Sequence, residues 1–196
     1  VTTQISYKNI TDTSVYFRQD SSFNTSSDYF SPKASFYVVD NVSTQTIVND
    51  SVSVDYQYGG LLLHKKGRGL AGFEALRTID NQTGVITETA YHQHWPYIGM
   101  PLSTLQTKGS VILSSSNNDL KQLRTASGGV MPYIYSSSDK NNSLGSDGNQ
   151  YEISTTQNIF IYDNFGNVEE STVTVLDTEK NQNKLSSTLS VNGHAR

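Results

Sequence analysis

Three glycines within six residues form the motif that most resembles a ligand-binding loop. Gly67, Gly69 and Gly72, in the segment GRGLAG, have the G-x-G-x-x-G spacing of dinucleotide-binding loops. Such a loop binds pyrophosphate when it follows a strand and opens a helix whose N-terminus faces the anion. Here FEALRTID (73–80) runs straight into the turn sequence DNQTG (80–84), so no crossover helix of useful length follows. The spacing alone therefore does not predict a nucleotide site.

A β-turn interpretation accounts for the same residues. We expect Gly67 and Gly69 to form a tight turn or bulge, and Gly72 to let a strand or an aromatic ring approach the backbone closely. Arg68 would then extend to the surface or bond to carbonyl groups of the loop. Phe73, Leu76 and Ile79 would supply the buried side of a curved strand.

Two histidines separated by one residue are the second chemical candidate. His92 and His94, in AYHQHWP, would lie on one face of a strand and could share a metal ion. A third ligand such as His64 or Glu88 would have to come from elsewhere, so the site is incomplete. No G-x-S-x-G, H-E-x-x-H or Walker pattern is present. We therefore expect no enzyme activity, no cofactor and no metal.

Composition narrows the class of protein. The chain has 196 residues, enough for one sizeable domain, and a net charge of -4, which disfavours nucleic acid as a partner. It has no cysteine, and no apolar stretch approaches the roughly 20 residues that span a bilayer. Charged residues make up only 16%, while Ser, Thr, Asn and Gln abound, a balance typical of extracellular β proteins. We expect a secreted or bacterial cell-surface location, and a piece of a longer protein.

The glycine motif and the histidine pair must be positioned by strands, which the alternation of apolar and polar residues predicts. Apolar side chains recur at every second position, the period of a strand with one buried face. Turn signals with glycines suited to positive φ, Gly84 and Gly166, join such runs. The pattern predicts an all-β fold: an antiparallel hairpin ribbon or sandwich of roughly ten to twelve strands, with little helix. The runs include 35–42, 51–58, 84–95, 110–116, 158–163 and 171–177, and the turns 48–50, 80–84 and 163–167.

Two segments depart from this alternation. NNDLKQLRT (117–125) predicts one or two helical turns capped by an asparagine. SSSDKNNSLGSDGNQ (136–150) has Leu144 as its one apolar residue and predicts an exposed flexible loop. Strand-like patterning resumes beyond that loop, so we expect residues 1–196 to form a single β domain.

Two blocks of the sequence resemble a known family. The first, residues 56–101, has aromatic strand residues, a G-R-G-x-x-G-F turn, a D-x-x-T-G hairpin and an aromatic strand ending in Q-x-x-P-x-x-G. The second, FIYDNFGNVEESTVTV (160–175), looks like a single YD repeat. Both resemble Rhs/YD-repeat proteins, most closely segments of insecticidal toxin complex B components and of the Salmonella plasmid virulence protein B group. The residues that carry the likeness are Tyr56, Tyr58, Gly67, Arg68, Gly69, Gly72, Phe73, Asp80, Thr83, Gly84, Tyr91, Gln93, Pro96, Gly99, Tyr162, Asp163, Gly166 and Asn167.

The resemblance implies a structural role. In such proteins a β ribbon coils into a hollow shell, which in toxin complexes encloses a C-terminal effector. It implies a non-enzymatic segment of a secreted toxin-type protein, whose partners are the rest of its own polypeptide or toxin-complex subunits. A piece of such a ribbon exposes two strand edges, so we expect it to close on itself or to pair with a second copy. The alternative is an adhesive β module whose exposed tyrosines bind carbohydrate or another surface.

Overall fold

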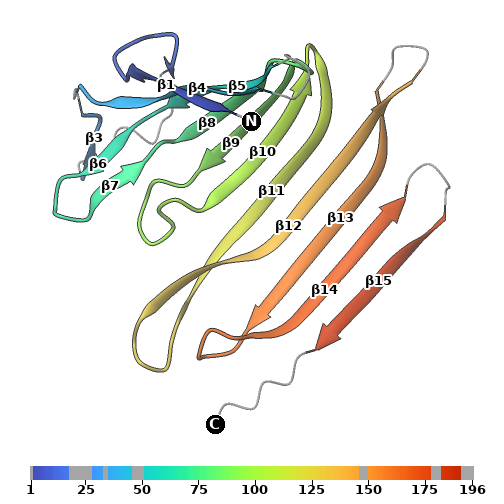
Figure 1. The fold of residues 1–196 in the computed structure, drawn as a ribbon. Coiled ribbons are helices and arrows are strands. Elements are labelled where there is room, and N and C mark those ends of the chain that lie inside the picture. The colour runs from blue at the N-terminus through green and yellow to red at the C-terminus, as the bar shows by residue number, and fades with distance from the viewer. Residues whose placement is uncertain are drawn as a thin grey trace. The chain divides into compact units, whose positions relative to one another are not determined.

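The computed structural model describes residues 2–17, 28–32, 35–45, 51–145, 150–177 and 182–190, and among these every regular element is a strand (Figure 1). The predicted all-β, antiparallel fold is confirmed. The described residues contain fifteen strands, more than the predicted ten to twelve; two of them, β2 (Tyr16–Phe17) and β3 (Tyr29–Phe30), are too short to show alternation. No described helix is long and apolar enough to cross a membrane.

The described chain divides into two compact units. The first consists of residues up to His94 with 98–101 and 106–109, and the second of 95–97, 102–105 and the residues from Ser110 onward. β10 (Pro101–Lys108) contributes residues to both. A single domain over 1–196 stays a prediction, and the expected turn at 48–50 lies outside the described residues.

The first unit contains a main sheet with the strand order β1-β4-β5-β8-β9. β5 is its central strand, because it pairs antiparallel with β8 on one side and with β4 on the other. β4 pairs only with the first part of β5, residues 51–55. The end of β5 pairs with β2, which runs parallel to it with Tyr16 opposite Tyr58. The main strands are β1 (Thr3–Asn9), β4 (Tyr37–Gln45), β5 (Ser51–Gly59), β8 (Ala75–Asp80) and β9 (Val85–Tyr91).

A smaller sheet completes the first unit, with the order β3-β6-β7. β6 (Leu62–His64) and β7 (Gly69–Gly72) form its hairpin. The buried residues form two clusters that meet at consecutive residues, because Leu61 belongs to one and Leu62 to the other. The first cluster contains Ile10, Val15, Val38 and Leu61, and the second contains Tyr29, Leu62 and Ala71.

The second unit is a run of long antiparallel hairpins in the order β11-β12-β13-β14-β15, which lie side by side in Figure 1. Each strand pairs with the next along the chain. Pairing of the chain with a second copy through strand edges stays a prediction, which light scattering of the purified chain would test. The strands are β11 (Val111–Arg124), β12 (Val130–Leu144), β13 (Gln150–Tyr162), β14 (Val168–Asp177) and β15 (Gln182–Ser190).

Two sequence predictions within this unit are wrong. The expected helical turns at 117–125 are part of β11, and most of the expected loop at 136–150 is the second half of β12 and the start of β13; residues 146–149 lie outside the described part. Both segments lack apolar alternation, and in 136–144 some polar side chains bond across the strands instead. Asn158 donates to Ser137 at 2.8 Å, and Lys140 pairs with Glu152 at 3.2 Å.

The corner after β5 is the tightest point of the first unit. A Cβ on Gly59 would lie 2.7 Å from the Phe17 ring, and one on Gly60 would lie 2.6 Å from Cβ of Glu74. Gly60 also has a φ of 62°. Because these contacts are shorter than 3 Å, a side chain at Gly59 requires the Phe17 ring to move, and one at Gly60 requires Glu74 to move.

Gly60→Ala should destabilise the chain more than Gly84→Ala. Both glycines have positive φ, 62° and 69°, so the backbone strain of alanine is matched. Only Gly60 has a neighbour within 4 Å of the new methyl group. We expect an additional loss of about 1–3 kcal/mol for Gly60→Ala in urea unfolding. Equal losses in the two variants would contradict the close packing of Glu74 on Gly60.

Candidate functional site

The glycine motif is a β-hairpin turn. Gly67 lies in the turn between β6 and β7, and β7 pairs back with His64 opposite Gly69 and Leu62 opposite Gly72. An antiparallel strand thus follows the glycines where a dinucleotide site needs a helix. All three glycines have φ between 80° and 85°, the region that favours glycine. The expected close approach at Gly72 is wrong, because nothing lies within 4 Å of the place of its Cβ; the close approach is at Gly59 and Gly60.

The side chain of the motif residue Gln93 donates hydrogen bonds to two separate parts of the chain. It is 4% exposed, and its Nε2 donates to the carbonyl oxygens of Gly60, at 2.5 Å, and Gly72, at 2.8 Å. Gly60 follows β5 of the main sheet, whereas Gly72 ends β7 of the small sheet. One buried amide therefore connects the two sheets of the first unit, and it uses both of its N–H groups to do so. We call this contact of Gln93 with Gly60 and Gly72 the Gln93 joint.

Main-chain bonds hold Gln93 in this place. Before it, Tyr91 N–H donates to the carbonyl of Glu74 at 2.7 Å. After it, the loop that contains Pro96 closes, because His92 N–H donates to Met100 and Gly99 N–H donates back to His92, both at 2.8 Å. The motif residues Tyr91, Gln93, Pro96 and Gly99 thus belong to one strand end and its loop.

An apolar cleft lies beside this joint. Its volume is 240 Å³, and the rings of Tyr58 and Phe73 pack at its wall with their centres 4.9 Å apart. Burial raises the pKa of the Tyr58 hydroxyl. Phe73 and Tyr58 also pack against the first core cluster, and both are partly buried; Phe73 lies before β8 and not within it. The cleft is lined by Tyr58, Ala71, Gly72, Phe73, Leu76, Tyr91 and Gly99.

The histidine pair, His92 and His94, and the possible third ligand His64 lie among aromatic rings. His64 and His94 both contact the ring of Tyr29, with centroid distances of 4.8 and 4.6 Å, and His92 lies 5.9 Å from His94. Nδ1 of His92 accepts a hydrogen bond from the backbone N–H of His94 at 3.1 Å. Burial lowers the pKa of His92. The described residues contain no group of three or more His, Cys, Asp or Glu that could hold a metal ion.

The YD unit builds a turn around one carboxylate. Oδ1 of Asp163 accepts from the backbone N–H groups of Phe165 and Asn167, each at 2.8 Å, and Oδ2 accepts from the Asn167 amide at 3.0 Å. Gly166 completes the turn with a φ of 92°. The ring of Tyr162 packs on a neighbouring strand's tyrosine, Tyr133, at 4.6 Å. Asp80 and Thr83 build a similar turn before Gly84 in the first unit.

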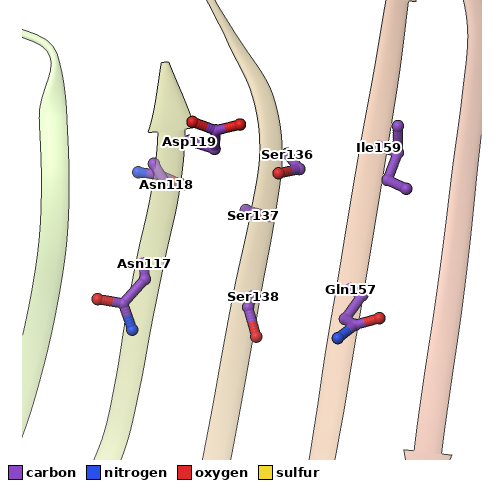
Figure 2. Close-up of a pocket in the computed structure, with 8 residues that line it drawn as sticks. All are labelled: Asn117, Asn118, Asp119, Ser136, Ser137, Ser138, Gln157 and Ile159. Carbon is purple, nitrogen blue, oxygen red and sulfur yellow. The ribbon is translucent and has the colours of Figure 1, made fainter.

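A polar groove crosses three strands of the second unit. Figure 2 shows its residues on β11, β12 and β13, and its volume is 440 Å³. Sequence reasoning missed this groove, because six of its eight residues fall in the two segments that predict helix and loop. It is lined by Asn117, Asn118, Asp119, Ser136, Ser137, Ser138, Gln157 and Ile159.

Comparison with known proteins identifies the family. Residues 1–99 match the family model described as the insecticide toxin TcdB middle/N-terminal region. Because this match covers half of the 196 residues, the chain belongs to that family. The matched part contains the glycine hairpin, the Asp80 turn and Gln93. A search of curated proteins finds no match to this chain.

Replacing Gln93 by Met should unfold the joint between the two sheets. Methionine has nearly the same shape but removes both N–H donors, so it leaves the Gly72 carbonyl without this partner. We expect a loss of about 2–4 kcal/mol in unfolding free energy. The matched control is Gln82→Met, because Gln82 also bonds to a neighbouring strand but is exposed; its loss should stay below about 1 kcal/mol. Similar losses for the two variants would exclude a special role for Gln93.

The Asp163 turn should make stability depend on pH. The Asn167 side chain and then the backbone N–H groups lower the pKa of Asp163 from 3.8. A lowered pKa in the folded state adds stability above pH 3.8 that is lost as the pH falls through the lowered value. Asp163→Asn keeps the shape without the charge. The melting temperature of the wild type should exceed that of the variant near pH 7, and the difference should shrink towards about pH 3. A constant difference across this range would contradict the assignment.

Proposed function

We propose that the chain is a non-enzymatic structural segment of a secreted Rhs/YD-type toxin protein. It would contribute to a β shell that encloses or presents a toxic effector. The observation that carries the proposal is the family match over residues 1–99, which contain the Gln93 joint. The partners would be the rest of the parent polypeptide or other subunits of a toxin complex.

The geometry supports a scaffold role in two ways. Gln93 connects the two sheets of the first unit, because its Nε2 donates to a main-chain carbonyl in each part. The Asp80 and Asp163 carboxylates accept hydrogen bonds from turn N–H groups, so each fixes the connection between two strands. Side chains that are engaged in this way hold a ribbon in a defined curvature and register.

The YD likeness adds support from the second unit. Tyr162 packs across to the next hairpin, and the Ala126 N–H in the β11–β12 turn donates to the Asn164 carbonyl in the β13–β14 turn at 3.0 Å. Neighbouring hairpins thus contact each other at their turns as well as along their strands. Such repeated contact between like units is how ribbon and solenoid proteins extend a wall.

Protease accessibility of the parent polypeptide tests the proposal. In the wild-type parent, the region C-terminal to the shell should resist a protease that is added from outside. Gln93→Met should open the wall and expose that region, whereas Gln82→Met should leave it protected. The cleavage products can be followed by mass spectrometry. Equal digestion of the C-terminal region in all three proteins would contradict enclosure.

A further inference from the structure

The polar groove of the second unit has the geometry of a trough. Strand register places Asn117, Ser138 and Gln157 in one row across the sheet. The next row on the same face contains Asp119, Ser136 and Ile159. The central strand carries the small serines, while the outer strands carry longer side chains that are exposed (Figure 2). Small residues between larger ones produce the hollow.

The polar side chains that line the groove on this face are not bonded to other described residues. Those of Asn117, Asp119, Ser136, Ser138 and Gln157 make no side-chain hydrogen bond to another described residue. The opposite face of the same strands differs, because there Asn158 donates to Ser137 at 2.8 Å and to Asp139 at 3.4 Å. One face is therefore satisfied internally, while the other keeps amide, hydroxyl and carboxylate groups available to a ligand.

The chemistry of the groove defines its ligand class. It contains one carboxylate and no cation, which disfavours phosphate and other anions. The nearest cation on the same face of β12, Lys140, is paired with Glu152 at 3.2 Å. Ile159, 40% exposed, is its single large apolar side chain, so the groove does not suit a lipid or an apolar peptide.

We propose that this groove binds a neutral carbohydrate of one or two sugar rings. Asn117 and Gln157 can donate to and accept from ring hydroxyls from the two walls, and Asp119 can accept from a pair of them. Ile159 offers an apolar contact for the C–H face of the sugar. Neighbouring strands are about 4.8 Å apart, close to the width of one pyranose ring. The volume of 440 Å³ falls in the range of small-molecule sites.

This site does not depend on exposed tyrosines. It goes beyond the scaffold function, and a shell segment could carry it on its surface. Because the groove is open and rests on hydrogen bonds that compete with water, we expect binding in the millimolar range. Specificity would come from the spacing of the two rows, which a sugar with the wrong hydroxyl configuration cannot match.

Titration of the isotope-labelled 196-residue chain, followed by NMR, tests the proposal. The probes are glucose, galactose, N-acetylglucosamine and lactose, with inorganic phosphate as the anionic comparison. At least one sugar should cause saturable shifts that are confined to backbone amides of 117–119, 136–138 and 157–159. Asp119→Asn and Gln157→Ala should each weaken that sugar at least about tenfold, as expected for a lost hydrogen bond to a charged or donor group. Thr156→Val, on the opposite face, should leave its affinity unchanged.

Several outcomes would overturn the assignment. The first is the absence of saturable shifts with all four sugars up to their solubility limits. The second is an equal response to phosphate at the same amides, which would identify an anion site. The third is a shift of the groove amides with protein concentration alone, which would show that a second copy covers the face. Loss of affinity in Thr156→Val equal to that in Gln157→Ala would point to a general structural effect.

Discussion

One buried amide group determines how the first unit is held together. Gln93 donates to a carbonyl at the end of the main sheet and to another at the end of the small sheet. Both acceptors belong to glycines with positive φ, 62° for Gly60 and 82° for Gly72. Without the amide, the second of these carbonyls would lose its buried partner, which is a costly state. The two glycines supply the carbonyl acceptors, and the Gln93 amide supplies the hydrogen-bond donor for both of them.

The second unit is stabilised in a different way. Among the residues of this unit whose burial the structure describes, Thr155 is the one buried residue, so the long strands depend on main-chain pairing and on polar contacts across strands. The turn between β13 and β14 is fixed by the Asp163 carboxylate, which accepts hydrogen bonds from Asn167. This construction leaves one sheet face satisfied and the other chemically open, which is why a scaffold of this kind can also present a polar groove.

The all-β fold and its hairpins follow from the sequence because apolar alternation and turn residues are local signals. The family resemblance of residues 56–101 includes Gln93 among its motif residues. The role of Gln93 depends on Gly60 and Gly72, which lie 33 and 21 residues away, and no local sequence pattern reveals such a contact. The predictions for 117–125 and 136–150 are wrong because these segments are mostly polar and their few apolar residues do not recur at every second position. There the pairing with neighbouring strands supplies the stability, so the local pattern indicates helix or loop where the chain forms strands.

The central claim is that Gln93 binds both carbonyl groups at once in solution. The side-chain amide of Gln93, observed by NMR in the labelled chain, reports on it directly. Both Nε2 protons should exchange slowly with solvent and show couplings through the hydrogen bonds to the Gly60 and Gly72 carbonyl carbons. Rapid exchange at the rate of the exposed Gln82 amide would contradict the claim.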